Sequence, residues 1–302
     1  MSPPTEFTVQ VPATTANLGP GYDLLGLALN QYNRLTFRLS DHYQMRCSGP
    51  HGKIQYRLDA KNLVWQGVER VYREMGVPMP CFAVDQWVAI PPARGMGSSS
   101  SAIVAGLFAA NLWLGQPLSK TELLPFATEI EGHPDNVAPA LLGGAIMNFP
   151  QGEQPFCHLP IPDNLYFGVC VPRFTLKTKT ARQVIPQSVP LNHALQNLSY
   201  LGALLVGFQT GQHALIAQGL DDTLHQPYRQ SLVPGMADII QWAKTNGALG
   251  CVLSGAGPSL LVIGDRPLTE LGKKMCLEWK KHEIEADFVT CLIDRQGVVC
   301  LD

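Results

Sequence analysis

Two glycines and four serines stand together in residues 91–101, where the segment Pro-Pro-Ala-Arg-Gly-Met-Gly-Ser-Ser-Ser-Ser leads into an apolar stretch. Backbone N–H groups at a helix N-terminus are unpaired and carry the positive end of the helix dipole, so a loop there can hold a phosphate. Gly95 and Gly97 leave room for that close approach, and the serines add hydroxyl groups. The alternative is an ordinary capped helix after a glycine turn. The chemistry that this pattern indicates is phosphate binding.

Three better-known classes of site fail on spacing. The chain contains no Gly-x-x-x-x-Gly-Lys-Ser/Thr segment, so it has no Walker A loop. In a dinucleotide-binding Gly-x-Gly-x-x-Gly pattern, Ser100 would occupy the position of the third glycine. A hydrolase nucleophile elbow requires a glycine two residues after its serine, and Ser101 stands two residues after Ser99.

Hydrophobic periodicity predicts the elements that must position this loop. The expected strands lie near residues 7–11, 35–39, 82–90, 165–171 and 288–293. The expected helices cover residues 62–75, 102–114, 120–131, part of 191–220, and 236–245. Residues 12–22, rich in Thr, Asn and Gly, are expected to form a loop. Strands and helices mix without strict alternation, which favours an α+β fold over a doubly wound sheet.

Composition sets the size and the type of partner. The chain has 302 residues, of which 46% are hydrophobic and 15% charged, so two domains are expected, at residues 1–160 and 161–302. A formal net charge of -2 argues against a nucleic acid or an anionic membrane surface and favours a small partner.

Cysteine spacing and the apolar segments indicate a cytoplasmic protein. The eight cysteines form no Cys-x-x-Cys pair, and Cys81, Cys170 and Cys251 lie in apolar runs, so reduced and mostly buried thiols are expected. Residues 1–7 lack the basic flank and the apolar core of a signal peptide. The most apolar segments, residues 102–115 and 198–208, are too short to cross a bilayer.

The segment at residues 91–101 resembles the Pro-x-x-x-Gly-Leu-Gly-Ser-Ser loop of the GHMP kinases, with Met96 at the leucine position. Two more segments resemble motifs of that superfamily in the same order: Pro-Ala-Thr-Thr-Ala-Asn-Leu-Gly-Pro-Gly-Tyr-Asp at residues 12–23 and Leu-Ser-Gly-Ala-Gly-Pro-Ser at residues 253–259. Together they span the chain.

Within the superfamily, residues 12–23 look like the homoserine kinases, although Thr15 and Tyr22 replace a common serine and a common phenylalanine. Glu-Gly-His-Pro-Asp-Asn-Val-Ala-Pro at residues 131–139 and Thr-Lys-Thr-Ala-Arg at residues 178–182 resemble the same family.

This resemblance implies both a fold and an activity. The implied fold is a two-domain α+β GHMP kinase, with an N-terminal domain like domain 2 of ribosomal protein S5, a ferredoxin-like C-terminal domain, and the active site between them. The implied activity converts ATP and L-homoserine to ADP and O-phospho-L-homoserine, in threonine biosynthesis. The implied cofactors are ATP and Mg²⁺, and the resemblance is compatible with a homodimer.

The resemblance also implies the residues of the nucleotide site. Those expected to bind ATP are Asn62, Pro91, Pro92, Ala93, Arg94, Gly95, Met96, Gly97, Ser98, Ser99, Ser100 and Ser101. Ser99 and Glu129 are expected to bind Mg²⁺ because hard cations prefer oxygen ligands, and Glu131 is the alternative carboxylate. Asn62 could instead cap the helix that follows it.

Homoserine is a zwitterion with a terminal hydroxyl, so its site needs a cation, an anion and a polar group that orients the hydroxyl. The residues carried over for this role are Asn17, Asp23, His133, Asp135, Thr178, Arg182, Arg229 and Gly255. The first four are also the expected catalytic residues. Since the transition state of phosphoryl transfer is loose, positioning can suffice without a strong general base, and Asn17 or Asp23 is expected to orient the hydroxyl.

Several of these residues also have a purely structural interpretation: a structural role for His133, a turn at Asp135 and a glycine hairpin at Gly255. Two other functions compete as well. The first is a kinase for mevalonate or shikimate, acids without an ammonium group for Asp23 to bind. The second is a ligand-binding relative without catalysis, for which a degraded phosphate loop would be expected.

Overall fold

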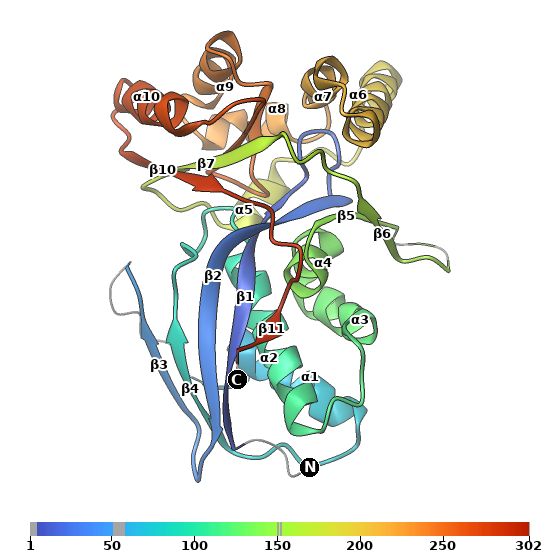
Figure 1. The fold of residues 1–302 in the computed structure, drawn as a ribbon, viewed down its shortest axis with the longest axis vertical. Coiled ribbons are helices and arrows are strands. Elements are labelled where there is room, and N and C mark those ends of the chain that lie inside the picture. Colours follow the sequence, from blue (N-terminus) through green and yellow to red (C-terminus); the bar gives the residue numbers. More distant parts are fainter. Residues whose placement is uncertain (1–4, 51–57, 150, 152, 302) are drawn as a thin grey trace.

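The computed structural model describes residues 5–50, 58–149, 151 and 153–301, and it contains two β-sheets covered by helices (Figure 1). Residues 1–4, the start of the segment in which no signal peptide is expected, lie outside this description. The class is α+β, as the sequence predicts.

The first sheet has seven strands and is built mainly from the first half of the chain. Its path runs β11 (Val299–Cys300), β1 (Glu6–Ala16), β2 (Leu25–Leu39), β4 (Phe82–Trp87) and β3 (Gln44–Ser48), while β5 (Ala145–Asn148) pairs with β2 and with β6 (Phe156–Leu159). The last strand of the chain therefore lies beside the first strand, with Val9 opposite Cys300.

Four helices pack against this sheet (Figure 1). They are α1 (Leu63–Glu74), α2 (Ser98–Trp113), α3 (Lys120–Glu131) and α4 (Pro134–Leu142). Alternate residues of the strands, such as Val9 and Val11, share one buried core with Ile103 and Leu107 of α2. This packing holds the start of α2, and with it the glycine loop, at one end of the sheet.

The second sheet has four strands and is covered on both faces. Its order is β10 (Ala286–Cys291), β7 (Tyr166–Pro172), β9 (Leu260–Gly264) and β8 (Gly250–Leu253). The helices of this half are α5 (Thr178–Gln183), α6 (Leu191–Thr210), α7 (His213–Gly219), α8 (Gln226–Arg229), the 3-10 helix Gln230–Leu232, α9 (Met236–Thr245) and α10 (Thr269–Lys280). Val169 faces the core shared with α6 and α7, while Cys170 faces the core shared with α9 and α10.

Most of the expected elements are present, but several differ at their boundaries; the strand expected over residues 82–90, for example, ends at Trp87. The helix expected from residue 102 begins at Ser98, because the serines form its first turn after Gly97, whose φ is 69°. The loop expected over residues 12–22 is a strand up to Ala16, with a shift of register after Pro12. The single helix expected within residues 191–220 is two helices, separated at Gly211 with φ 72°.

All eight cysteines are free thiols; Cys170, Cys251 and Cys291 are buried and the other five are partly buried. Among the described residues, no helix has both the length and the apolar character needed to cross a bilayer.

Candidate active site

One cavity of about 500 Å³ brings together three segments that are far apart in the sequence: residues 12–23, 91–101 and 253–259. From the first segment, Asn17 donates a hydrogen bond from Nδ2 to the carbonyl of Gly255, at 2.9 Å. From the third, Ser254 donates from Oγ to the carbonyl of Gly95 in the glycine loop, at 2.5 Å. Hydrogen bonds therefore join all three motifs directly.

The glycine loop delivers free backbone N–H groups to the cavity. Gly97, in left-handed conformation, precedes α2, and no side chain caps the start of this helix. A Cβ atom at Gly97 would lie 1.9 Å from Oγ1 of Thr14, and one at Gly95 would lie 2.1 Å from the carbonyl oxygen of Ser254. Only glycine fits at these two positions, and the 16-residue helix behind them supplies the dipole that favours an anion.

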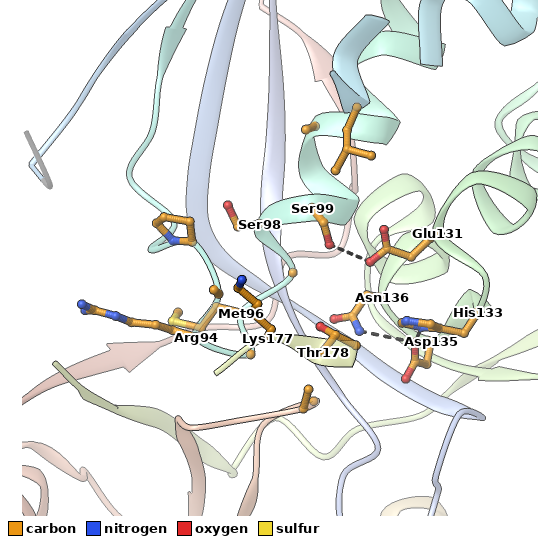
Figure 2. A pocket seen from close by; sticks show the side chains of 18 of the residues that line it. Arg94, Met96, Ser98, Ser99, Glu131, His133, Asp135, Asn136, Lys177 and Thr178 are labelled. Atoms are coloured by element: carbon orange, nitrogen blue, oxygen red, sulfur yellow. Dashed lines mark hydrogen bonds and ion pairs between the residues drawn. The ribbon is translucent and has the colours of Figure 1, made fainter. Parts of the chain in front are cut away.

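Glu131 is the carboxylate that faces this loop (Figure 2). One of its oxygens, Oε1, accepts hydrogen bonds from Oγ of Ser99 at 2.7 Å and from Oγ of Ser100 at 3.0 Å. Burial raises the pKa of Glu131, although the bond from Ser99 opposes the shift. A carboxylate whose charge is disfavoured by burial, next to a hydroxyl, is a ligand pair suited to a hard cation.

Glu129, expected as the metal ligand, lies elsewhere. Its carboxylate accepts from Nε of Arg70 at 2.8 Å and lies 3.7 Å from Arg73, and Glu129 does not line the cavity. Residues two apart on a helix point to nearly opposite sides, so Glu129 and Glu131 cannot both face Ser99. The structure corrects the expectation in favour of the alternative carboxylate, Glu131.

Asp23 and Arg182, which both line the cavity, form an ion pair. Both terminal nitrogens of Arg182 bond to the carboxylate of Asp23, at 2.6 and 3.0 Å, and both side chains are about one-third exposed. Oδ1 of Asn17 accepts from the backbone N–H of Asp23 at 3.1 Å. Asn17, Leu18 and Asp23 have φ values of 72°, 48° and 58°, so this loop holds three non-glycine residues in the left-handed region. The amide of Asn17 thus shapes the loop with both of its polar atoms.

Arg229 reaches the same cavity from α8 and is only 2% exposed. Its guanidinium lies over the ring of Tyr22, 5.3 Å from the centroid. Burial lowers the pKa of Arg229, but arginine stays protonated in proteins. A second cation therefore stands near Arg182 without a carboxylate partner of its own among the described residues.

His133 and Asp135 form a second polar pair, through Nδ1 of the imidazole and Oδ1 of the carboxylate (Figure 2). Burial alone would lower the pKa of His133, but the hydrogen bond and the charge of Asp135 outweigh it and raise that pKa. Nδ2 of Asn136 also donates to Asp135, at 3.3 Å. One polar atom from each of Asp23, His133 and Asp135 lies within 4.8 Å of the other two, so the loop and α4 meet here.

The remaining expected residues divide into two groups. Those that line the cavity are Pro92, Ala93, Arg94, Gly95, Met96, Gly97, Ser98, Thr178 and Gly255. Pro91, Ser100 and Ser101 do not line it. Ser101 instead bonds to the carbonyl of Ser98 at 2.9 Å and accepts from Asn33 at 2.8 Å, so it fixes the turn from behind.

Asn62 lies at the start of α1. Its Oδ1 accepts from the backbone N–H of Val64 at 2.9 Å and of Trp65 at 3.3 Å, so it caps α1; it also lines the cavity, and its role in ATP binding stays a prediction. Other residues of the cavity lining were not predicted as site residues, among them Met45, Gln86, Val88, Asn136 and Lys177. Of these, only Asn136 and Lys177 could have been found, because they are next to expected site residues.

This architecture is that of the GHMP kinases. The sequence model described as "GHMP kinases N terminal domain" matches residues 62–144, and that described as "GHMP kinases C terminal" matches residues 204–281. The solved structure of the mevalonate kinase of Methanococcus jannaschii has the same fold, with a TM-score of 0.70 at 12% identity over 95% of this chain and 98% of that one.

The closer similarities lie in one branch of the superfamily. The homoserine kinase of Thermosynechococcus vestitus is 43% identical, over 97% of this chain and 98% of its own, and that of Carboxydothermus hydrogenoformans is 37% identical, over 97% and 96%. The crystal structure of a homoserine kinase from Cytophaga hutchinsonii matches with a TM-score of 0.87 and 30% identity, over 100% of this chain and 99% of that one. The chain belongs to the homoserine kinase family.

Proposed function

We propose that the chain transfers the γ-phosphate of ATP to the side-chain hydroxyl of L-homoserine, with the amino-acid part of the substrate held by Asp23, Arg182 and Arg229. Family membership supports the reaction, and the single observation that carries the site assignment is the position of these three charges. All three line the cavity that the glycine loop also lines.

The charges match a zwitterion. The substrate carboxylate binds Arg229 and Arg182, since both guanidinium groups line the cavity and Nη2 of Arg229 has no acceptor among the described residues. The substrate ammonium binds Asp23 and Asp135, whose carboxylates belong to the polar cluster at the end of α4. Mevalonate and shikimate would bring a carboxylate but no ammonium, so the remaining acceptor sites of these acidic groups would go unused.

ATP lies along the rest of the cavity. Met45, Leu63 and Val88 form an apolar wall beside the start of α1, suited to the adenine ring. The free N–H groups at the start of α2 hold the phosphates. Lys177, at the N-cap of α5, adds a positive charge at the cavity wall.

The residues present fit a magnesium ion. Ser99 and Glu131 offer a hydroxyl and a carboxylate oxygen next to the phosphate loop, and the raised pKa of Glu131 marks a carboxylate that burial leaves short of positive charge. When bound there, Mg²⁺ supplies charge neutralisation for the phosphates of ATP.

No side chain is needed as a strong base. Both carboxylate oxygens of Asp23 accept from Arg182, and the amide of Asn17 is bound to Gly255 and to the loop. The polar atoms of Asn17 are thus bonded within the protein, while the oxygens of Asp23 keep lone pairs for the substrate ammonium. Transfer therefore depends on alignment of the hydroxyl with the γ-phosphate, which lets its proton leave late.

The test is a coupled assay of ADP release with Mg²⁺, ATP and a panel of hydroxyl substrates. L-homoserine should be phosphorylated well above mevalonate, shikimate and galactose. Equal or better turnover of any of those three would refute the substrate assignment.

The free thiols also suit a reducing compartment, so we place the reaction in the cytoplasm.

A further inference from the structure

The guanidinium of Arg229 is held by three acceptors, none of which is charged. Its Nε donates to the carbonyl of Ala181 at 3.1 Å, and its Nη1 donates to the carbonyl of Gly255 at 3.1 Å and to Nδ1 of His225 at 3.2 Å. Within the described part of the chain, Nη2 has no hydrogen-bond partner, while Arg229 lines the cavity. The protein thus holds two of the three guanidinium nitrogens, Nε and Nη1, and the third, Nη2, is left for a ligand.

The contact with Arg229 determines the protonation of His225. A guanidinium only donates, so Nδ1 must be an unprotonated acceptor and the ring proton must sit on Nε2. There it donates to the carbonyl of Gly19, at 2.8 Å, in the loop that also carries Asp23. The imidazole is fully buried, and burial lowers the pKa of His225; nearby Asp222 opposes the shift and Arg229 reinforces it.

The segment that carries His225 is itself fixed. The buried carboxylate of Asp222 accepts from the backbone N–H groups of His225 at 3.0 Å and of Gln226 at 2.6 Å. On its other side, the imidazole stacks on the ring of Tyr22, with centroids 5.2 Å apart and planes 24° apart. The same ring faces the guanidinium of Arg229. The imidazole therefore has one orientation in which all of these contacts hold.

We propose that His225 is a positioning residue: as a neutral acceptor it aims the guanidinium of Arg229 at the substrate carboxylate without neutralising its charge. The inference rests on the proposed function, in which that carboxylate binds Arg229. A carboxylate at position 225 would hold the guanidinium equally well, but it would compete with the substrate for the positive charge. Arg182, in the same cavity, differs from Arg229 in this respect, because its charge is already shared with the carboxylate of Asp23.

Two substitutions separate the two hydrogen bonds of the imidazole. The amide of asparagine reaches the position of Nδ1, so His225→Asn keeps an acceptor for Arg229 and loses the bond to Gly19. The longer glutamine places its amide at the position of Nε2, so His225→Gln keeps the bond to Gly19 and leaves Arg229 without its acceptor. A merely structural histidine would not distinguish the two variants in this direction.

The experiment measures KM and kcat for homoserine and ATP, and titrates homoserine and a non-hydrolysable ATP analogue calorimetrically, in wild type and both variants. His225→Gln should weaken homoserine binding about tenfold or more, as expected when a buried donor loses its partner, while His225→Asn stays within about threefold. Binding of the ATP analogue should stay within about twofold in both.

The outcomes are distinguishable. Equal losses of homoserine affinity in the two variants, a larger loss in His225→Asn, or losses that extend equally to the ATP analogue would overturn the positioning role. Melting temperatures of both variants show whether either one unfolds, and the remaining folded variant still decides between retention and loss of affinity. Failure of the proposed function shows separately, as a wild-type protein that does not phosphorylate homoserine.

Discussion

Glu129 and Glu131 offer a matched pair of substitutions on one helix. Glu131→Gln removes a charge that lies 2.7 Å from the hydroxyl of Ser99 in the cavity, whereas Glu129→Gln removes a charge paired with Arg70 outside it. The two changes are chemically identical. They differ only in the side of α3 from which the charge is removed.

The expected size of the effect follows from what stays in place. In Glu131→Gln the hydroxyl of Ser99 and the N–H groups at the start of α2 remain, so only the contribution of one anionic ligand is lost. A loss of about 3 to 4 kcal/mol of transition-state stabilisation corresponds to a fall in kcat of about 10²- to 10³-fold. Glu129→Gln should leave kcat close to that of wild type, because an exposed ion pair contributes little.

The assay is ADP release with saturating homoserine, at Mg²⁺ concentrations from micromolar to tens of millimolar. The Glu131→Gln variant should show both the lower kcat and a higher Mg²⁺ requirement, with circular dichroism confirming that it is folded. Wild-type kinetics in Glu131→Gln, or a larger defect in Glu129→Gln, would refute the assignment of the metal site to this face of α3.

Three further predictions concern the carboxylate clamp, the glycine loop and pH. Arg229→Ala should weaken homoserine binding by about 2 to 5 kcal/mol with a smaller effect on ATP. Arg229→Lys should rescue it only in part, because lysine cannot reproduce the hydrogen bonds by which Nε and Nη1 hold the guanidinium in place. Calorimetry against Arg173→Ala, an exposed arginine, is the control, and unchanged affinity in Arg229→Ala removes the clamp. Gly97→Ala should abolish binding of an ATP analogue, since its Cβ would lie 1.9 Å from Oγ1 of Thr14 and its φ of 69° disfavours alanine; normal nucleotide affinity would contradict the role of the loop. Burial raises the pKa of Glu131 above 4.5, so at a pH between 4.5 and the raised pKa the native state holds a proton that the unfolded state has lost. Without metal or nucleotide, the thermal stability of wild type relative to Glu131→Gln should therefore fall as pH rises from about 4.5 and level off above the raised pKa. A stability difference that instead grows in favour of wild type as pH rises would show that the charged carboxylate is stabilised in the fold.

Local patterns in the sequence predict the structure well where one physical effect dominates. The capping box of Ser119 and Glu122 predicts the start of α3, and the structure shows both of its hydrogen bonds. The glycine loop before α2 is likewise a local device, so its place at a helix start follows from residue types alone. The boundary errors fall where backbone conformation, rather than side-chain pattern, decides. Gly211 in left-handed conformation ends α6, between Thr210 and Gln212.

The arrangement of the site depends on contacts across the chain, which no local pattern contains. Glu129 and Glu131 stand in one motif-like stretch, and only the rotation of α3 against α2 decides which of them faces Ser99. The histidine beside Arg229 is similar in one respect: Arg229 lies only four residues further along the chain, but the other partner, Gly19, is brought to His225 only by the fold. The apolar wall includes Met45, on β3, and Val88, directly after β4. These two strands pair in parallel, and no pattern in the sequence predicts that the two side chains line one cavity.

The claim that this cavity reads both charges of an amino acid is tested most directly by comparing homoserine with two analogues that each lack one charge. The analogues are 4-hydroxybutyrate, without the ammonium, and 3-amino-1-propanol, without the carboxylate. Because each analogue lacks one of the two charged groups that the proposed site binds, kcat/KM for phosphorylation should fall by about 10³-fold or more for both, relative to L-homoserine. Phosphorylation of either analogue with a kcat/KM within about tenfold of that for homoserine would contradict the account.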